Sequence, residues 1–291
     1  MLVRRVALSC VIGVALAVAA MWGAGASAFG ASSAAGTIET TVVNGTAGDT
    51  PVPNLKVVLH SHVGDVTLPD VAAVTNASGK VSFGGLDRSP LARYLVSGDY
   101  SGVTFESNDV QFAVDSQQQS VQLQIWDTTS DDPGLRVASR LLVLSAPDAA
   151  TQTVPVLELI TFDNPAKRAY VPSMSGAAGL MGLIRFGLPV GSSQVQSVVG
   201  LDPRQIIQID AGIATTNPVP PGKYQMGFAY RFPYGDRTYT LRKNLRYPTD
   251  DFRVLIPPAL LQVSSKELSS AGQATIGGRT VSYTHLTLPT I

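Results

Sequence analysis

The chain has 291 residues, with 21 basic and 21 acidic side chains and therefore no formal net charge. This balance argues against nucleic acid or an anionic membrane surface as a partner, because both attract proteins through a basic excess. The sole cysteine, Cys10, lies near the N-terminus, so the rest of the chain must be held by apolar cores without disulfides.

The first 28 residues have the pattern of a secretory signal peptide. Arg4 and Arg5 form a basic start, residues 6–21 are apolar, and residues 26–28 (ASA) offer a small-residue cleavage site. We therefore expect an exported protein, located outside the cell, in the periplasm or on the outer face of the cell membrane.

Strand signals begin after a linker of small residues at 29–36. Over residues 37–126, short runs rich in β-branched and aromatic residues alternate with turns of Gly, Pro, Asn, Asp and Ser. The segment LKVVLHSHV (55–63) alternates apolar and polar residues, as a half-buried strand does. This pattern predicts an all-β fold with an antiparallel β-sandwich in the first half.

Three segments of the first half together match a known family pattern. They are NGTAGDTPVPNLKVVL, the hairpin VTNASGKVSFGGL and the strand RYLVSGDYSG. The chain here resembles the carboxypeptidase-regulatory-like domain, a small prealbumin-like sandwich of exported bacterial proteins. The resemblance implies a shared fold and no peptidase activity. The residues that match the family positions are Thr75, Asn76, Gly79, Phe83, Leu86 and Tyr94.

The hairpin in this match has a physical basis in its turn residues. Asn76 to Gly79 can reverse the chain if Gly79 adopts a positive φ, which glycine does without steric cost. We therefore expect a tight turn at these residues.

Residues 127–134 (DTTSDDPG) form a polar linker between two β-rich halves. Asp127, Asp131 and Asp132 supply carboxylate oxygens, the ligands that Ca²⁺ prefers, but the spacing is that of no standard calcium loop. Two interpretations stay open: a calcium site, or a solvated linker that leaves the halves some freedom. We expect no other cofactor.

Residues 135–264 repeat the pattern of short strands and predict a second β-sandwich, after which 265–280 begin a further region. Aromatic residues alternate at Phe228, Tyr230, Phe232 and Tyr234. We interpret the first two as core and the last two as reaching the rim. The candidate surface for a glycan or protein ligand comprises Phe232, Tyr234, Arg237, Tyr239 and Tyr247.

His60 and His62 are two residues apart on an expected strand, which places both rings on one face. Such a pair can bind Zn²⁺ or Cu²⁺ with a third ligand, for which Asp65 and Asp70 are near in sequence. The alternative, which we favour, is that both rings lie on the solvated face. No sequence motif for a catalytic nucleophile or a phosphate loop occurs, so we expect no enzyme activity.

Residues 281–291 (VSYTHLTLPTI) can be back-translated into a sequence that resembles the transposon-end adapter of sequencing libraries. We interpret this stretch as an artefact that takes no part in the fold. The natural chain would then continue past residue 280, and a C-terminal membrane anchor would be unsurprising.

The sequence therefore favours an exported, non-enzymatic structural or interaction module of the cell envelope, with a protein or glycan partner. Two alternatives stay open: a carbohydrate-binding module, and the accessory region of an enzyme whose catalytic part lies beyond this chain.

Overall fold

The computed structural model describes residues 35–174, 182–235, 238–257, 261–262, 264–276 and 279–287. The predicted signal peptide and Arg237 lie outside these ranges, so the predictions that concern them stay predictions.

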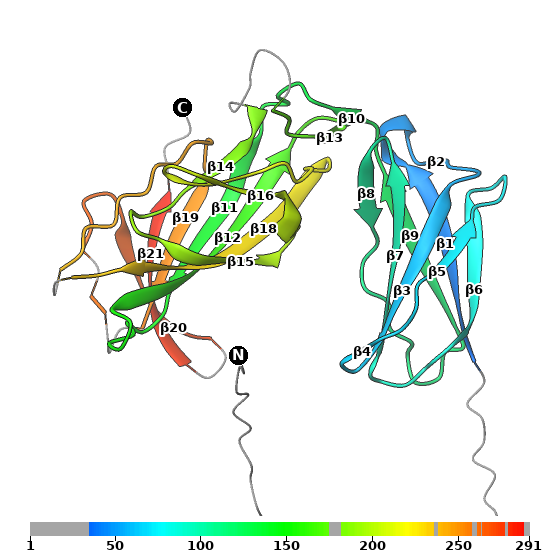
Figure 1. Ribbon diagram of the computed structural model, residues 1–291, viewed down its shortest axis with the longest axis horizontal. Helices are drawn as coiled ribbons and strands as arrows, with labels where there is room; N and C mark the ends of the chain where they lie inside the picture. Colours follow the sequence, from blue (N-terminus) through cyan, green and yellow to red (C-terminus); the bar gives the residue numbers. More distant parts are fainter. Residues whose placement is uncertain are drawn as a thin grey trace, which may run out of the picture. The chain divides into compact units, whose positions relative to one another are not determined.

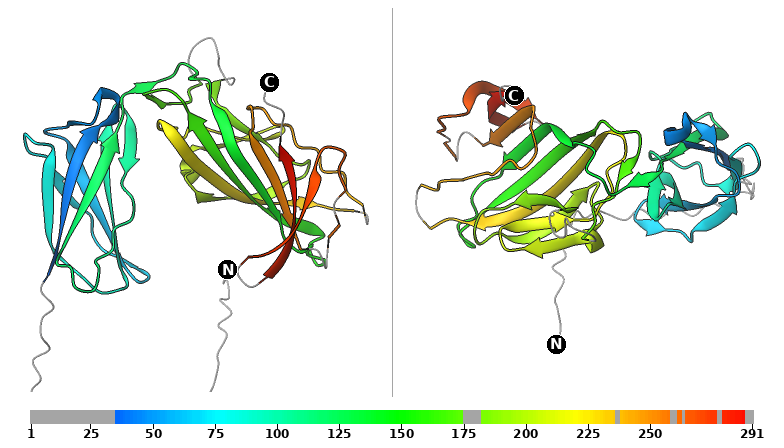
Figure 2. Two further views of the ribbon diagram at one scale, coloured as in Figure 1. Left: turned by 180° about the vertical axis from the view of Figure 1, so that it is seen from behind. Right: turned by 90° about the horizontal axis from the view of Figure 1, so that it is seen from above.

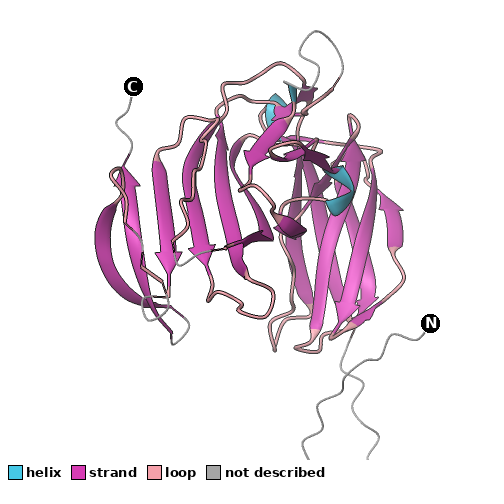
Figure 3. Cartoon of the chain, turned by 60° about the vertical axis from the view of Figure 1, so that its left-hand side comes forward, coloured by secondary structure: helices cyan, strands magenta, loops and turns pink. Residues whose placement is uncertain are grey.

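The described residues fold almost wholly into strands. Figure 3 shows strands joined by loops, with helical turns at η1 (Gly45–Ala47) and η3 (Pro203–Gln205). Within the described ranges, no helix is long and apolar enough to cross a membrane. Buried apolar side chains form two separate clusters, one for each half of the chain, which confirms the predicted pair of β-sandwiches.

The first sandwich consists of two sheets packed face to face (Figure 1). Its strands are β1 (Gly36–Asn44), β2 (Thr50–Pro51), β3 (Lys56–Val63), β4 (Val66–Thr67), β5 (Val71–Val74), β6 (Lys80–Leu86), β7 (Ala92–Tyr100), β8 (Val103–Glu106) and β9 (Gln118–Ile125). In one sheet, β1 pairs with β2 and β6 on one side and with β9 on the other. In the second sheet, β3 pairs with β4, β5 and β7, and β7 pairs with β8.

The turn predicted between β5 and β6 is confirmed. Gly79 has φ +69°, and the Asn76 side chain accepts hydrogen bonds from Ser78 N at 2.9 Å and Lys80 N at 3.0 Å. The Asn76 side chain thus provides hydrogen-bond acceptors for the backbone N–H groups of the turn that begins at Asn76.

The second sandwich packs a long sheet against a short one, and Figure 2 shows the long sheet from behind and from above. Its strands are β11 (Arg136–Leu144), β12 (Thr153–Asn164), β14 (Ile184–Gly187), β15 (Ser193–Val199), β16 (Ile206–Ile209), β17 (Gly212–Thr215), β18 (Gly222–Pro233), β19 (Asp251–Ile256), β20 (Ser269–Ile276) and β21 (Arg279–Thr287). The long sheet has the order β15-β18-β12-β11-β19-β21-β20, and the short sheet has the order β14-β17-β16.

Strand β12 shows how sequence alternation sets the core of the second sandwich. Its even-numbered residues, from Val154 to Asn164, are buried, and its odd-numbered residues are partly exposed. This is the period of two that a strand with one core-facing side requires. Most strand pairs are antiparallel, as predicted. Three pairs run parallel: β1 with β9, β11 with β19, and β10 (Thr128–Thr129) with β13 (Ala169–Tyr170).

The halves meet at a short ladder in which β10 (Thr128–Thr129) pairs with β13 (Ala169–Tyr170). Strand β10 lies inside the segment that the sequence predicted to be an open linker. The linker prediction therefore differs from the structure, because part of this segment is hydrogen-bonded as a strand.

The predicted exclusion of residues 281–291 also differs from the structure. Residues 282–287 of β21 pair antiparallel with β19, and the long sheet continues past residue 264 into β20. An alternating sequence that meets an open sheet edge completes its backbone hydrogen bonds in this way, whatever the origin of its codons. The adapter interpretation itself stays a prediction.

Candidate functional site

The two histidines of β3 bond to neighbouring side chains. His60 Nδ1 lies 2.8 Å from Asp70 Oδ1, and its Nε2 lies 2.8 Å from Ser97 Oγ. His62 Nδ1 lies 3.1 Å from Thr67 Oγ1. Within the described ranges, no group of three or more His, Cys, Asp and Glu side chains is placed to hold a metal ion. Asp70, one of the two predicted third ligands, therefore bonds to the His60 ring, and the described residues place no metal-binding group of three around the histidine pair.

The three linker aspartates point to different partners. Asp127 Oδ1 accepts hydrogen bonds from Asn44 Nδ2 and from the Tyr100 hydroxyl, both at 3.1 Å. Asp132 Oδ1 accepts from Gly134 N at 2.9 Å, and Asp131 is exposed. The carboxylates do not converge as calcium ligands would, and Asp127 serves instead as a hydrogen-bond acceptor for the first sandwich.

Asp127 is the centre of a polar cluster that we call the junction, formed by Asn44, Thr46, Tyr100, Asp127 and Lys167. Asp127 N donates to Thr46 Oγ1 at 3.0 Å, and this hydroxyl donates to the Lys167 carbonyl at 2.9 Å. Burial and the Asp127 carboxylate raise the pKa of Tyr100, so its hydroxyl stays protonated and donates at neutral pH.

Backbone and apolar contacts continue the junction. Ala169 N donates to the Asp127 carbonyl at 2.9 Å, and Val171 N donates to the Thr129 carbonyl at 2.8 Å. Ala169 is fully buried in the core cluster of the first sandwich, although it follows β12 of the second. The sequence does not reveal this arrangement, because residues 167–171 have no pattern that indicates pairing with a segment about 40 residues earlier in the chain.

The alternating aromatic residues of β18 lie mainly in the core. Phe228 and Tyr230 are 0% and 2% exposed, which confirms the prediction for this pair. Phe232 is also only 2% exposed, and Tyr239 covers it at a centroid distance of 4.8 Å. The predicted role of Phe232 in a binding surface differs from the structure, because a covered ring cannot stack on a ligand. Tyr234 is partly exposed, at the rim.

Residues 238–247, which we call the strap, form an extended segment that pairs with neither sheet. Its odd-numbered residues turn toward the core: Tyr247 packs edge-to-face on Phe162 at 5.4 Å, and Leu241 and Leu245 pack beside the core cluster. Tyr239 is 41% exposed. The candidate ligand residues on the strap thus anchor it to the sandwich, and only Tyr239 among them keeps a large exposed surface.

A buried ionic cluster fixes the middle of the strap. Glu158 of β12 is fully buried, with Arg140 Nε 2.6 Å from its Oε1 and Lys243 Nζ 2.6 Å from its Oε2. Lys243 also donates to the Gly187 carbonyl at 2.8 Å. Burial lowers the pKa of Lys243, and the neighbouring Glu158 carboxylate opposes that shift. The sequence signal for this cluster was Glu158 on the apolar face of a strand.

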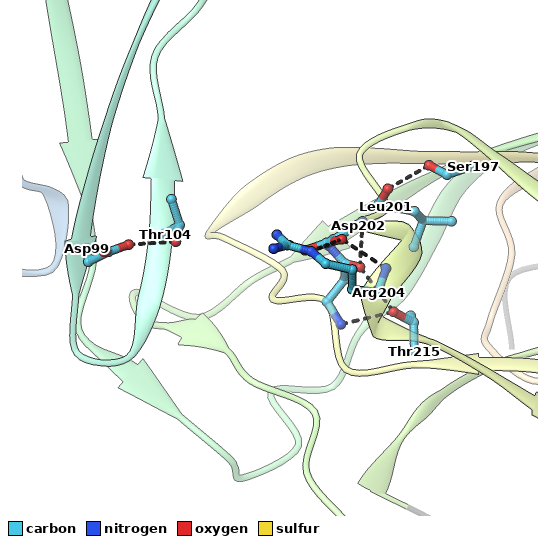
Figure 4. Close-up of polar contacts among 8 residues, drawn as sticks. Asp99, Thr104, Ser197, Leu201, Asp202, Arg204 and Thr215 are labelled. Atoms are coloured by element: carbon cyan, nitrogen blue, oxygen red, sulfur yellow. Dashed lines mark hydrogen bonds and ion pairs between the residues drawn. The ribbon is translucent and has the colours of Figure 1, made fainter. Parts of the chain in front are cut away.

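A groove of about 600 Å³ opens between β15 and β16 of the second sandwich. Figure 4 shows polar contacts of the lining residue Ser197 and of the nearby turn η3: Ser197 Oγ donates to the Leu201 carbonyl, and Asp202 caps η3 by accepting from Arg204 N at 2.9 Å. Hydrogen bonds from Arg204 lower the pKa of Asp202. The groove is lined by uncharged residues: Ser192, Ser193, Gln194, Val195, Gln196, Ser197, Pro203, Ile206, Gln208 and Ile213.

The chemistry of this groove is that of recognition. Its hydroxyl and amide groups can exchange hydrogen bonds with sugars or with peptide backbones, and Ile206 and Ile213 add an apolar floor. None of its lining side chains titrates near neutral pH, so the groove contains no group suited to general acid or base catalysis.

Comparisons with known proteins do not define a family. No family model and no curated protein sequence matches the chain. Similar solved structures include an M1 zinc metallopeptidase from Deinococcus radiodurans, at 14% identity and a TM-score of 0.27, matched over 54% of this chain and 40% of that one. They also include the major pilin of Corynebacterium diphtheriae, at 12% identity and a TM-score of 0.22, matched over 68% of this chain and 58% of that one. The chain spans less than two thirds of either protein, and similarity this low assigns no function.

Proposed function

We propose that the chain is a non-enzymatic structural or interaction module of the cell envelope that holds two β-sandwiches as a coupled pair. The signal-like first 28 residues support export, and the absence of charge in the groove of the second sandwich supports binding rather than catalysis. The partner is a protein or a glycan at the cell surface.

The junction is the observation that carries this proposal. A passive tether between independent domains has few contacts across it. Here Asp127 accepts from Asn44 and Tyr100 through its side chain and from Ala169 through its backbone. A segment tied on both sides transmits position and load from one sandwich to the other, which is what a structural module requires.

Calorimetry of the purified protein tests the coupling. We expect the two sandwiches to unfold in one transition, and Asp127→Ala to separate it into two, because the substitution removes both side-chain hydrogen bonds of the junction. Asp131→Ala is the matched control, since its exposed carboxylate lies in the same segment. Two resolved transitions in the unsubstituted protein would contradict the proposal.

We further propose that the first sandwich is related to the carboxypeptidase-regulatory-like domain. The hairpin with Gly79 at positive φ, in the position expected from the resemblance, supports this relationship. A membrane anchor encoded beyond residue 280 would place the pair at the outer face of the membrane. Hydrolase activity in the purified protein would contradict the non-enzymatic part of the proposal.

A carbohydrate-binding role is the second candidate, and the groove between β15 and β16 favours it. Exposed Gln194 and Gln196 present amide groups along a neutral, partly apolar surface, which suits hydroxyl-rich ligands. A glycan array with the unsubstituted protein and with Gln196→Ala tests it. The expected result is a sugar-dependent signal that the substitution lowers; no signal, or an unchanged one, would overturn this candidate.

A further inference from the structure

Strand β9 has one hydrogen-bonded edge and one open edge. Its register with β1 is uninterrupted, from Gln118 opposite Thr37 to Ile125 opposite Asn44. Thr37 N donates to the Gln117 carbonyl at 2.9 Å, so the alternation of a parallel ladder directs the odd-numbered residues of β9 toward β1. The backbone groups of the even-numbered residues therefore point outward.

Three of these outward residues have no backbone partner among the described residues. Gln118 is occupied locally, because the Ser116 hydroxyl bonds to its N–H and its carbonyl. Ser120, Gln122 and Gln124 remain, each with a free N–H and a free carbonyl along the edge. Unpaired groups in a regular row are a template for a further strand.

The edge has space beside it and lacks the features that usually block pairing. A cavity of about 310 Å³ lies beside it, between residues 108–111 and residues 119–122. Strand β9 contains no proline, no charged residue and no bulge. The edge strand β15 of the second sandwich differs, because two register shifts interrupt its ladder and disfavour a further strand.

The three unpaired residues are spaced symmetrically about Gln122, so a second copy of the same strand can pair with them. In an antiparallel pair about a two-fold axis at Gln122, Gln122 faces its own copy and Ser120 faces Gln124 of the other chain. Each outward residue then meets an outward residue, as hydrogen-bonded pairs of an antiparallel ladder require. The neutral strand meets no like charge in its copy and offers no charge to attract an acidic or basic partner.

We propose that β9 is a self-association edge, through which two copies of this chain join their first sandwiches in a continuous sheet with the axis at Gln122. The interface is one strand wide, so the dimer is weak and forms at high local concentration, as on a crowded cell surface. This inference does not depend on the proposed role as a structural or interaction module, since either proposal could hold without the other.

Analytical ultracentrifugation over a range of concentrations tests the edge with charged variants. The Gln122 side chain is exposed, so its replacement should leave the fold intact, which a thermal melt checks. Gln122→Lys and Gln122→Glu each place like charges opposite each other at the axis, and each should weaken self-association by about fivefold or more. An equimolar mixture of the two variants should associate at least as tightly as the unsubstituted protein, because lysine then faces glutamate.

Gln196→Lys on the edge strand β15 is the matched control and should leave self-association unchanged. A protein that stays monomeric at every concentration would overturn the proposal. So would a dimer that survives both single variants, or a mixture that fails to restore association although both variants are folded. Loss of the dimer in Gln196→Lys alone would place the interface on the second sandwich and would equally contradict the assignment.

Discussion

At the scale of single residues, the buried ionic cluster of the second sandwich is the feature that sequence reasoning could least anticipate. Glu158 was visible as a charge in an apolar strand, but its partners lie on β11 and on the strap. Burial of Phe228 and Tyr230 was predictable, because alternation alone fixes the inward face. The partner of a buried charge depends instead on tertiary packing, which alternation does not encode.

Glu158→Gln should destabilise the protein strongly. The amide has nearly the same shape but leaves the Arg140 and Lys243 charges without a counter-charge, a change that costs about 3–5 kcal/mol in comparable buried pairs. Urea unfolding measures it as a lowered midpoint. Glu39→Gln, on an exposed position of the first sandwich, is the control and should change the free energy of unfolding by about 0.5 kcal/mol or less. Equal effects would show that the cluster adds nothing to stability.

Asp148 gives a pH-dependent prediction. Hydrogen bonds from Thr151 and Ala150, with Arg231 nearby, lower the pKa of this carboxyl below 3.8. Because the folded protein binds the proton less readily than the unfolded chain, this contribution to stability is present above pH 3.8 and is lost as the pH falls through the folded pKa. An NMR titration should give a pKa below 3.8. A carboxyl that titrates above that value would contradict the hydrogen-bonded turn.

At the scale of elements, the positions of the strands could be predicted from the sequence. Which strands pair with one another could be predicted only in part. The hairpin at Asn76 to Gly79 was predictable, because its turn residues satisfy their own backbone. The parallel pairing of β1 with β9 was not, because these strands are distant in sequence and no local signal sets their order. The strap was missed for a similar reason, since an alternating segment resembles a paired strand whether or not a ladder forms.

Gly79→Ala should destabilise the first sandwich by about 2 kcal/mol or more. The residue has φ +69°, and a Cβ would lie 2.7 Å from the Val42 carbonyl oxygen, so both backbone strain and a steric clash result. Gly64→Ala is the matched control, because Gly64 has φ +59° but open space around its Cβ. Thermal unfolding should show a smaller loss in the control. Equal losses would mean that the contact with β1 is easily relieved.

At the scale of the whole molecule, the proposed coupling of the two sandwiches depends on the junction. The sequence correctly predicts two sandwiches, but it predicts an open linker where the structure has a short ladder and a bonded Asp127. A segment of polar residues with proline and glycine favours a loop by its local preferences. These preferences do not show whether groups distant in sequence will form hydrogen bonds with the backbone of that segment. The fold of the first sandwich places Asn44, Thr46 and Tyr100 beside Asp127. The sequence of residues 127–134 alone therefore could not predict these contacts.

The most direct test of this central claim is a distance distribution between spin labels on the two sandwiches. The chain has no cysteine after residue 28, so Lys80→Cys and Gln196→Cys, both at exposed positions, label one site in each sandwich. Pulsed electron paramagnetic resonance should give one narrow distribution, which Asp127→Ala broadens and Asp131→Ala leaves unchanged. A distribution that is already broad, and that Asp127→Ala does not alter, would contradict a coupled pair.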